Sequence, residues 1–383
     1  MTKEQNKKAP NLRFKGFTND WEQRKLYEVA DYRNGKAHEQ HIYIHGNYIV
    51  VNSKFVSTSG KAKKYSDKLI EPLMKNEIAF VLSDVPNGKA LARTFLVKRS
   101  QKYTLNQRVA GITPHPNMNS YFLFILMNRN PYFLKFDDGV GQTNLSKKDV
   151  EQFNENYPTK REQQKIGEIF VKLDSLLTLQ QRKLDLLKQL KKGLLQKMFA
   201  DKGSKRPILR FEGFNNEWEC KKLGDIARMY QPKTITSSKL ASTGYPVFGA
   251  NGYIGFYSEA NHMDDQVTIS ARGEGTGTPS YVKGPVWITS NSMVINVDNS
   301  GIDKAFLFNN LSAHSLKKYV TGGAQPQLTR EVLKGISIML SGQNEQTKIG
   351  DLSKRLIKII SVQQNKLSKL KDVKKALLQQ MFI

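Results

Sequence analysis

The residues of this chain that are best suited to chemistry are polar and cationic side chains beside predicted turns. Asn106-Gln107-Arg108 and Ser290-Asn291 each stand at the end of a predicted strand. Asparagine and glutamine can form two hydrogen bonds with adenine, and arginine can do the same with guanine. These residue types therefore favour contacts with nucleic-acid bases, although each short motif by itself is a weak signal.

A glycine-rich segment, Arg272 to Thr278, follows another predicted strand. It lacks the third glycine of a dinucleotide-binding loop and the Gly-Lys-Ser/Thr ending of a P-loop. We therefore interpret it as a turn that brings the backbone and the Arg272 guanidinium close to a surface, rather than as a nucleotide site.

The loop from Ser57 to Tyr65 is polar and carries several lysines. In a strongly basic chain such a loop can contact phosphates, and it can equally be an ordinary solvated loop. The candidate nucleic-acid contacts predicted from the sequence are Lys54, Lys61, Lys63, Lys64, Asn106, Gln107, Arg108, Gln142, Asn251, Tyr253, Arg272, Ser290, Asn291 and Gln325.

Residues for catalysis or metal binding form no familiar pattern. His38, His41 and His45 cluster without a His-Glu-x-x-His motif or another zinc spacing, so exposed histidines beside a basic surface are the simpler interpretation. Cys220 is the one cysteine, and a cysteine zinc site or a disulfide within the chain is excluded. We expect no catalytic residue, no metal and no cofactor in this chain.

Composition indicates a polyanionic partner. The chain has 383 residues, a formal net charge of +26 and a pI of about 9.8. Such an excess of Lys and Arg favours nucleic acid first and an anionic membrane second. The longest apolar run, Tyr121 to Met127, is far shorter than the roughly 20 residues of a membrane span. We expect a soluble, cytoplasmic protein that does not bind a membrane.

The chain contains two copies of one plan. An opening motif, Leu-Arg-Phe-x-Gly-Phe followed by Trp, occurs at residues 12–21 and again 197 positions later, at 209–218. A second block, 161–199, aligns without gaps on 344–382 at an offset of 183, with 19 identities in 39 positions. The segments between the blocks barely resemble each other. Two copies of one frame with different contents suggest recognition of two different things.

A short loop repeats at the same offset of 183, just before the second block. Its pattern Gly-x-x-Gln-x-x-Leu contains Gln142 in the first copy and Gln325 in the second. Because the loop belongs to the repeated frame, we slightly favour a structural role for these glutamines over contacts with a nucleic-acid backbone.

The second block predicts a long helix in each half. Apolar residues recur at heptad spacing, which is typical of a coiled coil. Gln180 and Gln363 interrupt the two seams at equivalent positions, so they either meet and fix the register of the helices or point into solvent. The predicted seam is Ile166, Leu173, Leu184, Leu187 and Leu194 in the first helix, with Ile349, Leu356, Leu367, Leu370 and Leu377 in the second.

These patterns predict an α+β protein with two mixed α/β bodies and an internal pseudo-twofold repeat. The two long helices would separate the bodies and pack as an antiparallel coiled coil, although each helix could instead pack on its own body. Strands are expected at 42–51, 77–82, 247–248, 267–270 and 286–297, and a capping box joins Thr159 and Glu162. The predicted division is 1–158 for the first body, 159–200 for the first helix, 201–341 for the second body and 342–383 for the second helix.

The motifs resemble those of the specificity (S) subunits of type I restriction–modification systems. The resemblance rests on the opening motif, the Glu-Gln-x-x-Ile-Gly start and the Leu-Leu-Gln-x-Met-Phe end of each helix, and it covers nearly the whole chain. It implies two target-recognition domains, each reading one half of a split, asymmetric double-stranded DNA site. The helices would set the gap and bind DNA methyltransferase (M) subunits, two of them, and restriction/translocase (R) subunits would join. The S subunit of that family is not catalytic.

Other functions stay open on the sequence alone. A stand-alone bipartite DNA-binding regulator would bind DNA without a methyltransferase. A nuclease would cleave DNA as the purified chain. A coiled-coil scaffold with incidental positive charge would show no sequence preference on DNA.

Overall fold

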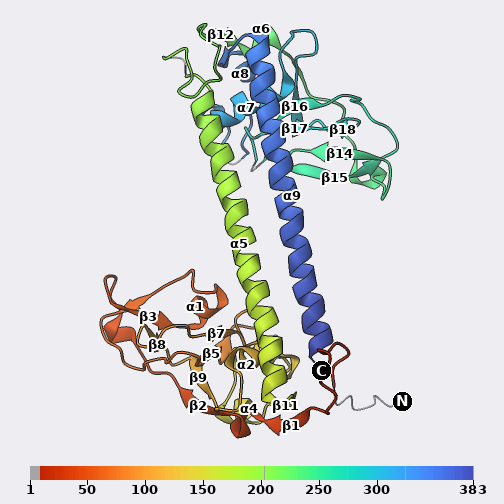
Figure 1. Ribbon diagram of the computed structural model, residues 1–383. Coiled ribbons are helices and arrows are strands. Elements are labelled where there is room, and N and C mark those ends of the chain that lie inside the picture. The colour runs from red at the N-terminus through yellow and green to blue at the C-terminus, as the bar shows by residue number, and fades with distance from the viewer. Residues whose placement is uncertain (1–8, 202, 274, 324, 383) are drawn as a thin grey trace. The chain divides into compact units, whose positions relative to one another are not determined.

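The computed structural model describes residues 9–201, 203–273, 275–323 and 325–382. Contacts divide the chain into two compact units: residues 1–179 with 368–383 form the first, and residues 180–367 form the second. These units cut across the four segments expected from the sequence, because each long helix contributes one part to each unit. Figure 1 colours the chain by residue number.

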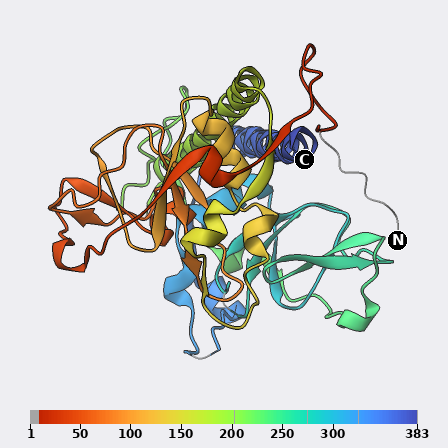
Figure 2. The same cartoon turned by 90° about the horizontal axis from the view of Figure 1, so that it is seen from below.

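The body of the first unit is built from two sheets and a covering helix (red to yellow in Figures 1 and 2). The larger sheet is antiparallel, in the order β2 (Ala30–Asn34), β9 (Val109–Pro114), β5 (Ile78–Val81), β7 (Thr94–Leu96). Helix α2 (Ser120–Met127) contributes to the same core as one face of β5, whereas the other face of β5 shares a second core with the smaller sheet. That smaller sheet has the order β4 (Tyr65–Ser66), β3 (Tyr48–Val51), β8 (Tyr103–Leu105), with β3 and β8 parallel.

The body of the second unit has the same topology although its sequence differs. Its larger sheet is β13 (Arg228–Tyr230), β19 (Ser292–Asn296), β16 (Gln266–Ser270), β17 (Pro279–Val282), and it is accompanied by α7 (Lys304–Ala313). The smaller sheet is β15 (Gly252–Tyr257), β14 (Tyr245–Gly249), β18 (Trp287–Ile288), with β14 and β18 parallel. The internal repeat therefore extends into the bodies, where sequence comparison did not detect it.

Short elements complete both units. In each, the strand after the opening motif pairs with the strand before a long helix. The remaining elements of the first unit are β1 (Glu22–Lys25), η1 (Leu26–Glu28), η2 (Glu39–His41), α1 (Ser53–Ser57), β6 (Ser83–Asp84), α3 (Pro131–Leu134), β10 (Thr143–Asn144), α4 (Lys147–Glu151) and β11 (Asn154–Tyr157). Those of the second are β12 (Glu219–Lys222), α6 (Leu223–Ile226), η3 (Ser237–Lys239), η4 (Leu316–Tyr319), α8 (Arg330–Lys334) and β20 (Ser337–Leu340).

The two long helices, α5 (Lys160–Met198) and α9 (Gln343–Met381), have 39 residues each. Within the first unit, the end of α9 meets the beginning of α5, where Phe382 packs against Phe170 with ring centroids 6.0 Å apart. Within the second unit, Ile349 near the start of α9 shares a core with Met198 at the end of α5. The pairing is antiparallel in each unit. Two mixed α/β bodies with two long antiparallel helices are thus confirmed.

The predicted seam residues are buried or half-buried. Ile166, Leu184, Ile349 and Leu367 are buried, whereas Leu173, Leu187, Leu194, Leu356, Leu370 and Leu377 are half-buried. The two register glutamines meet, as one of the two sequence interpretations required. The Gln363 side-chain amide donates to Gln180 Oε1 at 2.7 Å and to the Gln180 carbonyl oxygen at 3.1 Å.

Three local predictions differ from the structure. The strand expected at 42–51 is limited to Tyr48–Val51, because a turn closed by Gly46 N and the Tyr43 carbonyl interrupts it. The strand expected at 286–297 is two strands, β18 and β19, which belong to different sheets. The capping box is wrong: both carboxylate oxygens of Glu162 accept hydrogen bonds from Arg13.

Candidate nucleic-acid interface

Each opening motif is joined to the start of a long helix by a buried ion pair. Arg13 Nε and Nη2 donate to Glu162 Oε1 and Oε2 at 2.8 and 2.7 Å. Arg210 makes the same two bonds to Glu345 at 2.7 and 2.8 Å. Both carboxylates are 1 % exposed, and such bidentate charged hydrogen bonds are directional as well as strong. The ion pairs therefore fix the direction in which each body leaves its helix.

The glutamine after each of these glutamates joins the helix to the body. Gln163 Oε1 accepts from the backbone N–H of Asn119, the N-cap residue of α2, at 2.8 Å. Its amide donates to the Pro158 carbonyl at 2.9 Å. The equivalent residues of the second unit are Gln346, Asp303 and Ser341.

A glycine in each long helix permits this close packing. A Cβ atom on Gly167 would lie 2.9 Å from Asn119 Oδ1, and one on Gly350 would lie 2.4 Å from Asp303 Oδ1. We call the opening motif, the Glu-Gln-x-x-Ile-Gly segment and the N-cap of α2 or α7 the frame of each unit. The frame holds each body rigidly on its own helix segment.

In the first body, a turn between β8 and β9 presents three candidate residues, Asn106 to Arg108. The turn is fixed by backbone hydrogen bonds from Asn106 N to Val51 O (3.1 Å), from Val109 N to Asn106 O (2.9 Å) and from Leu82 N to Arg108 O (3.1 Å). The side chains of Gln107 and Arg108 are exposed, and Asn106 is half-buried. Gln107 Nε2 donates to Glu39 Oε1 at 3.2 Å. We call this the 106–108 turn.

The four candidate lysines lie at the same end of the smaller sheet as this turn. Lys54 is in α1, directly after β3, and the Lys64 carbonyl accepts from Val50 N at 2.9 Å. Lys61 and Lys63 are in the loop between them, and all four side chains are exposed. The structure thus brings together two groups of candidates that are about 50 positions apart in the sequence.

Gln142 borders the same region from the repeated loop. Its side-chain amide donates to Ser83 Oγ at 2.7 Å and to Asn144 Oδ1 at 3.2 Å. Leu145 N in turn donates to the Leu82 carbonyl at 2.8 Å, so the loop is attached to the residue after β5. These bonds agree with a structural role for this glutamine.

In the second body, a turn between β18 and β19 holds Ser290 and Asn291. Its backbone bonds run from Thr289 N to Phe248 O (3.0 Å), from Ser292 N to Thr289 O (3.0 Å) and from Ala271 N to Asn291 O (3.0 Å). Ser290 is half-buried and Asn291 is exposed. We call this the 289–291 turn.

The other candidates of the second body surround the end of β16. Asn251 Oδ1 would lie 2.4 Å from a Cβ atom on Gly275, so the β14–β15 turn abuts the glycine-rich segment. Arg272 forms a bridge with Gln327 of the repeated loop, in which Gln325 is exposed. Tyr253 is exposed and packs edge-on against Phe248. The glycines shape a surface turn, as the sequence predicted.

The comparisons with known proteins agree with this geometry. The family described as "Type I restriction modification DNA specificity domain" matches residues 18–189 and again residues 215–372. The chain belongs to this family. Each match includes one body and a large part of the long helix that follows it, so the two family matches coincide with the two copies of body and helix.

Individual relatives of the specificity-domain family are distant. The specificity subunit of type I restriction enzyme EcoprrI from Escherichia coli is 28% identical over 147 residues, which cover 37% of this chain and 36% of that protein. The chain thus aligns with about a third of that relative's length. The MjaVIII specificity subunit of Methanocaldococcus jannaschii is 21% identical over 401 residues, covering 94% of this chain and 91% of that one. The crystal structure of a type I S subunit from M. genitalium, at 18% identity, covers 98% of this chain and 99% of that one with a TM-score of 0.72, which shows a shared fold.

The three clustered histidines of this specificity-domain chain have separate partners. His38 is buried, not exposed as expected, and its ring nitrogens lie 2.7 Å from the Lys36 carbonyl and 2.7 Å from Thr104 Oγ1. Burial lowers the pKa of His38 below its usual value. His41 lies 3.4 Å from Asp67, and His45 packs edge-on against Tyr43. Among the residues that the structure describes, no group of His, Cys, Asp and Glu could hold a metal ion.

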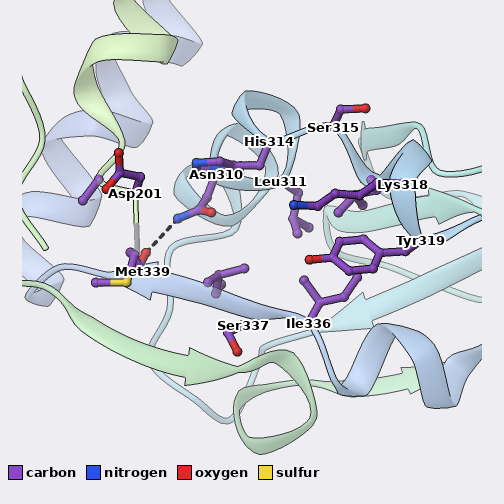
Figure 3. A pocket seen from close by; sticks show the side chains of 13 residues that line it. Asp201, Asn310, Leu311, His314, Ser315, Lys318, Tyr319, Ile336, Ser337 and Met339 are labelled. Atoms are coloured by element: carbon purple, nitrogen blue, oxygen red, sulfur yellow. Dashed lines mark hydrogen bonds between the residues drawn. The ribbon is translucent and has the colours of Figure 1, made fainter. Parts of the chain in front are cut away.

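A pocket of about 230 Å³ lies in the second unit, between the end of α5, α7 and β20 (Figure 3). Asn310 Nδ2 donates to the Met339 carbonyl at 2.8 Å, and His314 Nδ1 lies 3.1 Å from the Asn310 carbonyl. The pocket lies where the residues after α5 meet the second body, and its lining does not include the 289–291 turn. Within the described part of the chain, no helix has the length and apolarity needed to cross a bilayer.

Proposed function

We propose that the chain is the DNA-specificity subunit of a type I restriction–modification complex, and that each body recognises one half of a split, asymmetric double-stranded DNA target. The chain itself would be non-catalytic and would need no cofactor, while methylation and cleavage would be performed by M and R subunits. The observation that carries this proposal is the duplicated frame, which holds two bodies of one topology and different surfaces.

Charge supports DNA as the ligand. The net charge is +26, and the candidate lysines Lys54, Lys61, Lys63 and Lys64 are exposed at one end of the first body. Lysines in such a position neutralise phosphates and release counterions, which gives affinity without sequence information. The polar side chains of the two turns are of the types that distinguish bases. The combination suits a protein that binds the duplex by phosphates and selects its site by base edges.

The long helices offer a surface for the methyltransferase. Leu179, Leu186 and Leu190 of α5 are 62, 54 and 51 % exposed, and Leu176 is 37 % exposed. The equivalent residues of α9, 183 positions after Leu176 and Leu179, are Ile359 and Val362, which are 48 and 60 % exposed. Leu195 of the same helix is half-buried and packs on the core of the second unit, so it is not part of this surface. Exposed apolar side chains at heptad spacing are typical of an interface, and the repeat predicts one M subunit for each helix.

An exchange of bodies tests the recognition of half-sites. Asp31 and Thr113 are paired in β2 and β9, and Arg228 and Asn296 are paired at the equivalent positions of β13 and β19. The two ends of each segment therefore lie side by side in the sheet, outside the frame. Inserting residues 228–296 in place of 31–113 should give a protein whose enriched target carries the second half-site twice.

The reciprocal graft, with residues 31–113 in place of 228–296, is the matched control. It should give a target with two copies of the first half-site. Selection of a random duplex library by the full-length proteins, after circular dichroism has shown that they are folded, provides the measurement. A target in which both halves change together with either graft would contradict one body for each half-site.

Coexpression tests the partner. The chain and the methyltransferase subunit of the same system should elute as one complex in size-exclusion chromatography with light scattering. Leu179→Glu with Leu186→Glu should abolish coelution, whereas Lys183→Glu should weaken it less. Separate elution of the wild-type proteins at micromolar concentration would contradict the proposal.

A further inference from the structure

The 106–108 turn and the 289–291 turn occupy the same position in the two bodies. Each connects the parallel strand of the smaller sheet to the second strand of the larger sheet. Each is fixed by the same three backbone hydrogen bonds, at 2.9–3.1 Å in the first body and 3.0 Å in the second. The two turns also lie 183 positions apart, which is the offset of the long helices. The backbone is therefore repeated even though no residue from 106 to 109 is identical in the second copy.

The exposed side chains are what differ between the two turns. The last turn residue is Arg108 in the first body and Asn291 in the second. Both side chains are exposed, and within the described residues neither has a hydrogen-bond or ion-pair partner, since only the backbone carbonyl is bonded. Gln107, by contrast, is held by Glu39, and Ser290 is half-buried. A fixed backbone thus presents one free, chemically different side chain in each body.

We infer that this turn is a base-recognising element of each body, with Arg108 contacting guanine in one half-site and Asn291 contacting adenine in the other. The inference rests on the proposed function. Arginine matches O6 and N7 of guanine with two hydrogen bonds, and asparagine matches N6 and N7 of adenine.

The surroundings of both turns limit backbone movement. A Cβ atom on Gly35 would lie 2.1 Å from the Asn106 carbonyl oxygen, so only glycine permits this approach. In the second body, Gln231 Nε2 donates to the Ser290 carbonyl at 2.8 Å. A rigid backbone lowers the entropic cost of placing one side chain against one base edge.

The test compares three variants of the full-length protein by selection from a random duplex library, followed by titration with the enriched target. In Arg108→Ala, affinity for the wild-type target should fall roughly 10- to 100-fold. Preference for guanine should be lost at one position of one half-site, and the other half-site should be unchanged. Asn291→Ala should relax one adenine in the other half-site.

Lys64→Ala is the matched control, because its exposed side chain lies at the same end of the smaller sheet as the turn and is expected to contact phosphates. It should weaken binding uniformly across sequences and reduce the slope of log affinity against log salt by about one. Neither side chain of the turn variants has a partner within the described residues, and unchanged melting temperatures should show that all three proteins fold.

Three results would overturn the inference. If Arg108→Ala behaved like Lys64→Ala, Arg108 would contact phosphates and the proposed function would stand. If wild-type enrichment and affinity were unaffected by both turn variants, the turn would lie away from the DNA. A wild-type protein that enriches no sequence would overturn the proposed function together with the inference.

Discussion

The two tryptophans of the opening motifs predict a difference in stability between otherwise equivalent sites. Trp21 and Trp218 are 4 and 2 % exposed, and each packs on the first turn of a body helix, against Phe122 and Phe306 respectively. Trp218 Nε1 donates to Glu345 Oε2 at 3.1 Å. Trp21 Nε1 is buried with no hydrogen-bond partner among the described residues. The repeat is thus chemically unequal at this one atom.

Replacement of each tryptophan by phenylalanine isolates that atom. Both substitutions leave a similar cavity, so the loss of packing largely cancels in the comparison. Trp218→Phe also removes a hydrogen bond to a carboxylate, which contributes about 1.5–3 kcal/mol. Trp21→Phe instead removes an unpaired buried donor, whose burial costs about 1–3 kcal/mol. Trp218→Phe should therefore be the more destabilising of the two by about 3 kcal/mol.

Urea denaturation of the full-length variants, followed by circular dichroism, measures the free energy of unfolding. Hydrogen exchange in α2 and α7 assigns each change to its unit. Trp287→Phe is a control in the second unit, because among the described residues the Trp287 indole N–H is also buried without a hydrogen-bond partner. This substitution, like Trp21→Phe, removes an unpaired donor and should cost less stability than Trp218→Phe. Equal losses for Trp21→Phe and Trp218→Phe would refute the reasoning.

Three further predictions concern register, pH and salt. Replacing both Gln180 and Gln363 by leucine should raise the melting temperature, because a fully buried leucine contributes about 1.5–3 kcal/mol. The double variant should also accept a wider range of spacer lengths between half-sites, because the polar pair no longer fixes the register of the helices. An unchanged melting temperature and an unchanged spacer preference would contradict this prediction. Burial lowers the pKa of both His38 and His262, so the folded protein favours their neutral forms. The free energy of unfolding should therefore be highest above the usual histidine pKa of 6.5 and should fall as the pH decreases below it. In urea titrations between about pH 7.5 and 5.5, His262→Gln should reduce this fall. Affinity for the specific DNA should decrease with salt with a log–log slope of about −0.9 for each phosphate contacted, whereas a flat dependence would exclude phosphate contacts as a main source of affinity.

The sequence by itself determined the features that local periodicity encodes. The two long helices and their apolar seams follow from side chains spaced at three and four positions, because a helix places such residues on one face. The repeat follows from identities at a fixed offset, and it placed Gln180 and Gln363 at equivalent positions without deciding whether they meet. Helix α2, with eight residues, is too short for periodicity in the sequence to distinguish a helix from a buried strand.

Only the tertiary structure decided what the bodies share and where their candidate residues meet. Arg13 and Glu162 are 149 positions apart, and no local pattern predicts such a pair. The local sequence predicts a capping box for Glu162 instead, because Thr159 stands three positions before it. His38 was expected at the surface, but strand pairing buries it against Thr104. The 106–108 and 289–291 turns share no identical residue, because their conformation is set by backbone hydrogen bonds to neighbouring strands. The side chains of Arg108 and Asn291 face solvent, where packing imposes no residue type, so this position is free to differ while the turn stays the same.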